Sequence, residues 1–213
     1  MIDKILVFDD FIPEWYQDEI ERIFLEDAQW VLKYDITYAK HIFDKLQKIN
    51  PNLKPRPGFH HALVRDSQII SPIHLFLKPM LYTACEKINM RLEDVTLGRS
   101  FLQLPLSNID YSIKDPLHVD TYEDHIVFLY YVVSSDGKTI ITDCKYDFND
   151  TVKNLDNEMY VYDRSYDNCN IIQSITPKKG RLVLFNGRHY HAAEQSKDSI
   201  RCIVNYNLKV GKK

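Results

Sequence analysis

The sequence has few glycines and prolines and no long apolar run. Its 213 residues include only 6 glycines and 9 prolines, which excludes collagen-like and low-complexity chains. Hydrophobic residues make up 45% of the chain, enough for one substantial core at this length. No apolar stretch approaches the roughly 20 residues of a membrane-spanning helix, and the opening MIDKILVFDDFIPEWY does not resemble a secretion signal. We therefore expect a soluble, cytoplasmic protein.

The sequence also lacks an excess of positive charge and any closely spaced cysteines. Its formal net charge is −3, with both signs spread along the chain, so a nucleic-acid partner is not expected. The four cysteines contain no CxxC pair, which predicts reduced thiols rather than disulfides or structural zinc. They are Cys85, Cys144, Cys169 and Cys202. The glycosylation pattern at 149–151 is accordingly not expected to be used.

Helical patterns dominate the first part of the chain. Residues 12–32 predict a helix with a proline near its start and an apolar side. That side is formed by Trp15, Tyr16, Ile20, Ile23 and Phe24. Residues 71–92 predict a further helical segment, which Pro79 should kink or divide. We expect one domain over 1–213, with a helical support region at 1–95 and a β core at 98–210.

Short strand patterns dominate the second part of the chain. They are rich in branched and aromatic residues and are separated by turn signals such as Asp-Gly and Asn-Gly. The candidates in this part are 99–106, 125–133, 138–142, 159–162, 170–175, 180–185 and 199–208, and one further candidate, 4–8, lies in the first part of the chain. They predict an α+β, mainly β protein built as a sandwich or barrel. The acidic, tyrosine-rich segment 143–170 is interpreted as a solvated loop with an edge strand.

Two clusters of metal-ligand residues lie at strand ends. His118 and Asp120 precede an apolar strand pattern, and residues two apart on an extended chain point to the same side. His189 and His191 follow a strand and the Asn-Gly turn at 186–187. Two histidines and one carboxylate on one face of an iron leave positions open for an oxo-acid and dioxygen. Alternation alone allows either His189 or His191 as the third ligand.

The last strand pattern, 199–208, has one apolar face and one polar face. Arg201, Ile203, Asn205 and Asn207 share one side, and the residues between them are apolar apart from a tyrosine hydroxyl. The apolar face is expected to pack on helices and the polar face to look into a barrel. An arginine inside a barrel requires an anion, and its guanidinium fork suits a carboxylate.

The order of these motifs resembles the Fe(II)- and 2-oxoglutarate-dependent oxygenase superfamily. The matching features are the HxD pair, the strand FLYYV, an Asp-Gly turn, PKKGRLVLF, a histidine after an aromatic residue, and an arginine ten residues later. The resemblance covers residues 102–208, and more loosely the opening VFDDFIPEWYQDEIERIF. It is closest to the prolyl-4-hydroxylase-like branch, which includes members encoded by bacteriophages. It implies a double-stranded β-helix, a jelly-roll or cupin-like barrel, buttressed by N-terminal helices.

The resemblance also implies roles for individual residues. His118, Asp120 and His191 would bind Fe(II), because His191 follows Tyr190 and precedes two alanines as in the resembled pattern. His189 would then line the mouth or be structural. His125 and the pair His60–His61 are not expected to be ligands, and His61 is expected to pack against the helices.

The cosubstrate residues follow from the same resemblance. Arg201 would hold the distal carboxylate of 2-oxoglutarate, and the hydroxyl of Tyr131 would reach the same group. Asn205 is a further cosubstrate candidate because it faces the same way as Arg201. A tyrosine common before the HxD cannot be assigned; its place is left open between Gln103, Asn108 and Tyr111.

The implied activity is hydroxylation of a C–H bond, with release of succinate and CO2 and with ascorbate as reductant. The resemblance favours a prolyl or other side chain of a peptide or protein, and the acidic segment 143–170 would favour a basic substrate. A small molecule or a nucleobase is the competing substrate class. Two competing functions are a cupin-type dioxygenase that uses no 2-oxoglutarate and a non-catalytic β-barrel that binds a metal or a small acid. The oligomeric state is left open.

Overall fold

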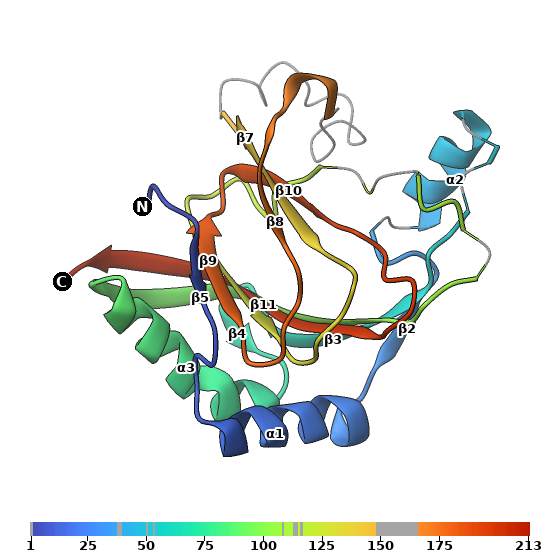
Figure 1. The fold of residues 1–213 in the computed structure, drawn as a ribbon. Coiled ribbons are helices and arrows are strands. Elements are labelled where there is room, and N and C mark those ends of the chain that lie inside the picture. Colours follow the sequence, from blue (N-terminus) through green and yellow to red (C-terminus); the bar gives the residue numbers. More distant parts are fainter. Residues whose placement is uncertain are drawn as a thin grey trace.

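Two antiparallel sheets facing each other form the framework of the protein in the computed structural model (Figure 1). The structure describes residues 2–37, 40–49, 51–52, 54–107, 109–112, 115, 117–147 and 166–213. The strand expected at 159–162, the glycosylation pattern at 149–151 and the candidate Asn108 lie outside the described residues.

The large sheet has the strand order β1-β9-β6-β11-β5-β3-β2, with β4 paired to β3. Its strands are β1 (Leu6–Phe8), β9 (Leu182–Asn186), β6 (Ile126–Tyr131), β11 (Arg201–Lys212), β5 (Met90–Gln103), β3 (Gly58–Arg65), β2 (Val31–Lys33) and β4 (Gln68–Ile69). The small sheet has the order β10-β7-β8, from β10 (His189–Ala193), β7 (Thr139–Lys145) and β8 (Ile171–Ile175). This mainly β arrangement is a double-stranded β-helix, as the sequence resemblance implies.

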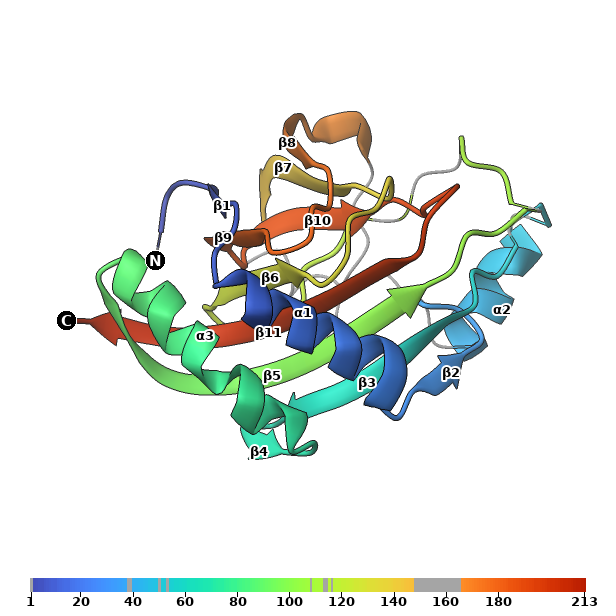
Figure 2. The ribbon, with the colours of Figure 1, turned by 60° about the horizontal axis from the view of Figure 1, so that its bottom comes forward.

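Helices α1 and α3 lie against the outer face of the large sheet (Figures 1 and 2). Helix α1 (Glu14–Arg22) continues into a π-helical turn, Ile23–Asp27, and Pro13 stands immediately before it. Trp15 was expected on the buried side but is 69% exposed and stacks on Tyr16. Of the described helices, none is long and apolar enough to cross a membrane.

Helix α3 (Ile73–Lys87) runs through Pro79 without dividing. A proline removes the hydrogen bond to the carbonyl four residues earlier, which here belongs to Leu75. Leu75 is on the exposed side of the helix, so water can satisfy that carbonyl. Helix α2 (Lys40–Ile49) lies apart from α1 and α3, beyond the β2 end of the large sheet (Figure 2), and a short 3-10 turn spans Tyr166–Asn168.

The two faces of β11 confirm the predicted alternation. Cys202, Val204, Tyr206 and Leu208 join the core beneath the helices, which also contains buried residues of α1 and α3. Ile203 faces the opposite way and joins the core between the sheets, with residues from β6, β7, β8 and β9. The polar residues of β11 therefore look into the barrel.

The sequence patterns missed part of the large sheet. Residues 31–33 were expected to end the first helix, but they form β2 and pair with β3. β3 had no predicted counterpart, and β5 begins at Met90 rather than near residue 99. The region expected to be helical support, 1–95, therefore also contributes strands to the barrel.

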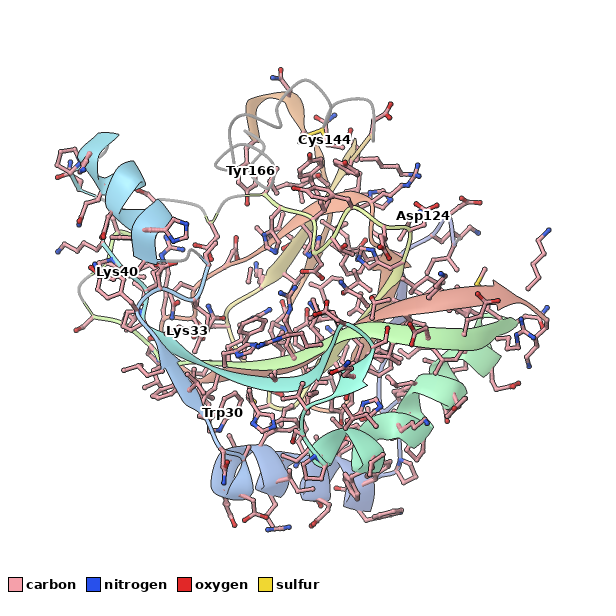
Figure 3. All side chains as sticks on the ribbon, turned by 180° about the vertical axis from the view of Figure 1, so that it is seen from behind. Trp30, Lys33, Lys40, Asp124, Cys144 and Tyr166 are labelled. Atoms are coloured by element: carbon pink, nitrogen blue, oxygen red, sulfur yellow. A yellow bond between two sulfur atoms is a disulfide. The ribbon has the colours of Figure 1, made fainter. Side chains whose placement is uncertain are left out.

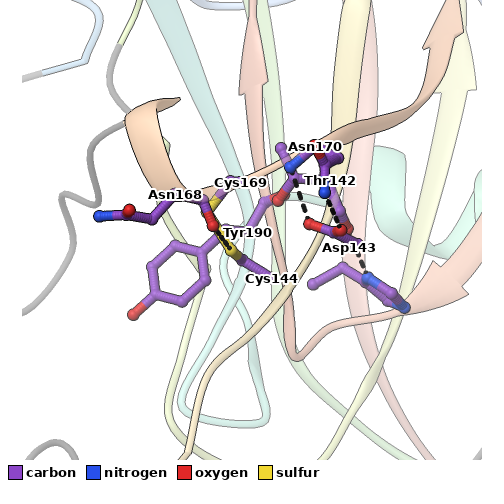
Figure 4. Close-up of a disulfide and its surroundings, with 8 residues drawn as sticks. Thr142, Asp143, Cys144, Asn168, Cys169, Asn170 and Tyr190 are labelled. Atoms are coloured by element: carbon purple, nitrogen blue, oxygen red, sulfur yellow. Dashed lines mark hydrogen bonds between the residues drawn. A yellow bond between two sulfur atoms is a disulfide. The ribbon is translucent and has the colours of Figure 1, made fainter.

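Two of the four cysteines form a disulfide, which corrects the prediction of reduced thiols. Cys144, in β7, is bonded to Cys169, just before β8. Next to it, Asp143 accepts hydrogen bonds from the backbone and side-chain nitrogens of Asn170, each at 2.8 Å (Figure 4). The spacing of 25 residues gave no signal, because the pair is brought together by β7–β8 pairing. The other two cysteines are free and buried.

Candidate metal centre

His118 and His191 are brought together by backbone pairing at the edge of the small sheet. Each backbone N–H donates to the other residue's carbonyl, both at 2.9 Å, in an antiparallel bridge. Residues paired in this way project their side chains to the same face. The two imidazole rings accordingly lie with their centroids 4.7 Å apart.

Asp120 completes a group of three ligand atoms. Nε2 of His118 lies 4.0 Å from Oδ1 of Asp120, and Nε2 of His191 lies 3.9 Å from Oδ2. Two atoms bound to one transition metal at about 2.1 Å can be at most about 4.2 Å apart, so both pairs fit a shared ion. All three ligand atoms lie within 4.8 Å of one another. Side-chain exposure is 1% for Asp120, 8% for His191 and 31% for His118, so the group opens on the His118 side.

The electrostatics of the group keep it ready to bind a cation. Burial lowers the pKa of His191 to about 4, helped by the neighbouring His118, so its imidazole is neutral at pH 7. Its Nδ1 lies 3.0 Å from the carbonyl of His189; a carbonyl can only accept, so Nδ1 carries the proton and Nε2 keeps its lone pair. Burial alone would raise the pKa of Asp120, but Arg99, the two histidines and Asn205 together lower it.

Two polar residues of the large sheet hold the Asp120 carboxylate. Asn205 donates from Nδ2 to Oδ2 at 3.0 Å, and Arg99, in β5, donates from Nη2 to Oδ1. Arg99 stands opposite Asn205 in the β5–β11 pairing. Sequence reasoning placed Asn205 on the correct face and assigned it to the cosubstrate; the structure brings it to Asp120. Arg99 was not singled out from the sequence, although its strand was predicted, because nothing local links it to Asp120.

Arg201 is buried inside the barrel without an acid beside it. It is 3% exposed, and among the described residues it forms no salt bridge. Its guanidinium donates to the Gly137 carbonyl at 3.0 Å, to Oε1 of Gln103 at 3.1 Å and to Oγ1 of Thr139 at 3.0 Å. Burial lowers the pKa of Arg201, yet a guanidinium stays charged in proteins. A buried charge surrounded by neutral acceptors is costly unless an anion joins it.

Tyr131 lies beside Arg201, and both bond to Thr139. Its hydroxyl donates to Oγ1 of Thr139 at 2.7 Å, the oxygen that also accepts from Arg201. Burial raises the pKa of Tyr131, so it stays a neutral donor. Thr139 was not singled out from the sequence, and Gln103 was one of three candidates for the open position. Tyr111, another of them, instead donates to the carbonyl of Leu106 at 2.7 Å.

The remaining histidines stay outside the three-residue group. Nδ1 of His189 bonds to the carbonyl of Thr142 at 2.7 Å, and a register shift separates His189 from His191 in the β10–β7 pairing. The ring of His125 packs against Gly187 and its Nδ1 bonds to the carbonyl of Glu123. His61 lies among Phe24, Trp30 and Ser71 beneath the sheet, as expected of a residue that packs against helices.

Comparison with known proteins agrees with this fold. No family model matches the sequence, and no curated protein is detectably similar to it. The chain is similar in structure to the non-haem α-ketoglutarate-dependent epimerase SnoN from nogalamycin biosynthesis, with a TM-score of 0.58 and 11% identity over 96% of this chain and 77% of that one. A second SnoN structure, in complex with Fe3+, α-ketoglutarate and nogalamycin RO, gives 0.57 and 12% over 96% and 78%.

A Pseudomonas putida prolyl-4-hydroxylase matches less well, with a TM-score of 0.49 and 10% identity over 98% of this chain and 92% of that one. The fold is thus shared with the SnoN structures. The closer relation to prolyl-4-hydroxylases, including phage-encoded ones, stays a prediction.

Proposed function

We propose that the protein is an Fe(II)- and 2-oxoglutarate-dependent dioxygenase. His118, Asp120 and His191 would hold the iron, and Arg201 with Tyr131 would hold the distal carboxylate of 2-oxoglutarate. The observation that carries the proposal is the buried Arg201 without an acid, on the same face of β11 as Asn205, which binds Asp120. Four residues along a strand span about 13 Å, a distance that an arginine side chain and a five-carbon diacid can bridge.

The chain's own residues would prepare this site in three ways. The His189 carbonyl fixes the His191 tautomer, and Arg99 and Asn205 fix the Asp120 carboxylate. Arg201 would neutralise the distal carboxylate of the cosubstrate. The apolar cluster that contains Tyr131 and Ile203 excludes water from the interior. With Fe(II) and 2-oxoglutarate bound, such a site supplies C–H oxidation, in which substrate, 2-oxoglutarate and O2 give hydroxylated substrate, succinate and CO2.

The substrate proposal is coarser than the proposal of the reaction class. A prolyl or other side chain of a peptide is proposed from the sequence resemblance, with a small molecule or nucleobase as the competing class. The expectation of a basic substrate rested on segment 143–170, of which 148–165 lies outside the described residues. Because Arg99, the described charged side chain that contacts Asp120 from the large sheet, is cationic, a basic substrate is not proposed.

The test is formation of succinate from 2-oxoglutarate under air, with Fe(II) and ascorbate. The native protein is compared with His191→Ala, Arg201→Ala and the matched control His189→Ala. We expect iron-dependent succinate in the native protein and in His189→Ala, and none in the other two. Calorimetric binding of Mn(II) and then 2-oxoglutarate is measured in parallel, so that a slow uncoupled reaction is distinguished from an empty site.

Each outcome separates the candidate functions. Iron binding without 2-oxoglutarate binding would favour a cupin-type dioxygenase or a non-catalytic barrel. Failure to bind either would overturn the proposal. Succinate formation that survives in His191→Ala and is lost in His189→Ala would mean that His189, and not His191, is the third iron ligand.

A further inference from the structure

A row of side chains leads from Asp120 outward across β5, β3 and β2 on the inner face of the large sheet. Arg99, Phe101 and Gln103 alternate along β5 and share the face that carries Arg201. His60 pairs with Phe101 in the β3–β5 ladder. Lys33 pairs with Gly58, which in turn pairs with Gln103. These three strands lie next to one another in Figure 2.

Lys33 marks the outer end of this row. Figure 3 places it at the end of β2 toward α2, away from Trp30. We call Arg99, Phe101, His60 and Lys33 the rim. Lys33 is exposed, and 23% of the Arg99 side chain is accessible, so a bound molecule can reach both cations.

The middle of the rim is an aromatic surface formed by two rings that are tilted by 51° against each other. The guanidinium carbon of Arg99 lies 5.4 Å from the centroid of the Phe101 ring, and the Phe101 and His60 rings have centroids 5.3 Å apart. Burial first, and then the positive charges of Lys33, Arg99 and Arg65, lower the pKa of His60 to about 4. The imidazole is therefore neutral at pH 7 and offers an uncharged planar face.

The described residues compensate the charge of the rim only in part. The one described acid that pairs with Arg99 is Asp120. The Asp120 carboxylate also interacts with His118 and His191 and accepts a hydrogen bond from Asn205. Nε of Arg99 is buried without a hydrogen-bond partner. Lys33 forms no ion pair within the described part of the chain. A cation held by Asp120 would add further positive charge, so the rim favours an anion.

We propose that the rim binds a small organic acid with a planar group as the substrate of this site. Arg99 pairs with the carboxylate through the donors that Asp120 does not use, and one ring of the Phe101–His60 pair stacks against the planar group. Lys33 adds long-range attraction. The inference rests on the proposed function for the chemistry, and it names the substrate class that the rim selects.

The test uses a matched pair of probes, indole-3-acetate and the neutral indole-3-acetamide. Each is titrated calorimetrically into native protein loaded with Mn(II) and 2-oxoglutarate, so that Arg201 is already paired with the 2-oxoglutarate carboxylate. We expect the acid to bind at least about tenfold more tightly than the amide, a difference of about 1.4 kcal/mol. Arg99→Gln should abolish this preference, and Lys33→Gln should reduce it.

Two further variants separate recognition from damage to the site. Arg91→Gln removes a 69% exposed arginine from the other end of β5 and should leave the preference unchanged. Phe101→Leu leaves the Arg99–Asp120 pair in place and should weaken the binding of both probes. Mn(II) affinity is recorded for every variant, because Arg99 contacts Asp120.

Equal affinity for the acid and the amide in the native protein would overturn the proposal, as would the absence of saturable binding of the acid. A preference that persists in Arg99→Gln would also overturn it. Failure of the proposed function looks different, because the native protein would then not bind Mn(II) or 2-oxoglutarate. In that case the two probes are compared on the metal-free Arg201→Met variant, which still tests the rim.

Discussion

At the scale of single residues, Thr139 joins the two groups proposed to hold 2-oxoglutarate. One hydroxyl oxygen accepts from Tyr131 at 2.7 Å and from Arg201 at 3.0 Å. Thr139→Val keeps the shape and removes both acceptor contacts, so we expect about tenfold weaker 2-oxoglutarate binding to the Mn(II)-loaded protein by calorimetry.

The matched control for Thr139 is Thr142→Val, on the same strand. Thr142 is also buried, but its hydroxyl donates to the carbonyl of Tyr190. Thr142→Val should lower the free energy of unfolding but leave the affinity for 2-oxoglutarate unchanged. Equal binding losses in both variants would show that Thr139 acts only through general packing.

Gly137 is required by close approach rather than by an unusual backbone angle. A Cβ there would lie 2.8 Å from the carbonyl of Glu194, 2.9 Å from the nitrogen of Ser196 and 3.1 Å from Cδ of Arg201. Gly137→Ala must therefore shift the turn whose carbonyl accepts from Arg201. We expect unfolding free energy to fall by about 1–3 kcal/mol in urea denaturation, together with weaker 2-oxoglutarate binding.

Gly211→Ala is the comparison for Gly137. Its Cβ would meet the flexible end of the Glu93 side chain, which can move aside. The variant should change stability by less than about 0.5 kcal/mol. If Gly137→Ala were equally silent, the turn would not support Arg201 as described.

At the scale of elements, the sequence was sufficient where a pattern was local. Alternation along β11 identified both its faces, and the HxD spacing identified two residues that the structure brings to one point. The predicted strands at 125–133, 138–142 and 180–185 match β6, β7 and β9 closely. In β11 a period of two carries the information, and in β6, β7 and β9 it is a run of branched and aromatic residues bounded by turn signals.

The sequence was insufficient where the partner lies far along the chain. β3 reads as Gly-Phe-His-His-Ala-Leu, in which the alternating buried and half-buried residues do not differ in polarity. Arg99 could not be linked to Asp120 without knowing that β5 lies beside β11. Trp15 was placed on the apolar side of the first helix, yet it packs on a neighbouring ring at the surface.

The Cys144–Cys169 bridge ties β7 to the chain before β8, so its loss should be felt in stability. Closing a loop of 25 residues is worth about 3.5 kcal/mol through the entropy of the unfolded chain. We expect the double variant Cys144→Ser and Cys169→Ser to unfold at lower urea concentration by about that free energy. The native protein in excess reductant should match the double variant.

The double variant itself should not respond to reductant, since Cys85 and Cys202 are free thiols. A native curve that reductant leaves unchanged would contradict the bridge. The bridge also bears on location, because such bonds persist mainly in oxidising compartments. The cytoplasmic location expected from the sequence stays a prediction, and the disulfide argues against it.

At the scale of the whole molecule, the large sheet separates two environments. Its outer face and the helices form one apolar core, while its inner face combines a smaller apolar cluster with the ligand group and Arg201. The sheet can carry polar groups on its inner face because its outer face buries apolar side chains against the helices. The helical layer thus stabilises a sheet whose inner face carries the ligand group and Arg201.

The same burial makes the stability of the metal-free protein depend on pH. The pKa values of His60, His74, His189 and His191 are all lowered, with burial as the largest cause. Below about pH 6.5 these histidines are protonated in the unfolded chain but stay neutral in the folded chain. The free energy of unfolding is therefore highest above that pH and falls as the pH decreases toward 4. One fully buried histidine contributes at most about 1.4 kcal/mol per pH unit.

His74 allows this dependence to be measured outside the metal centre. It is 3% exposed, beneath the sheet, and its Nδ1 lies 3.1 Å from the Tyr206 hydroxyl. In urea denaturation at pH 7, 6 and 5 with a chelator present, His74→Asn should lose less stability per pH unit than the native protein, because one histidine that resists protonation is gone. His41→Asn, at an exposed position of α2, should keep the native slope. A native slope of zero, or an unchanged slope in His74→Asn, would mean that the buried histidines accept protons without unfolding, and that the helical layer does not shield them from water.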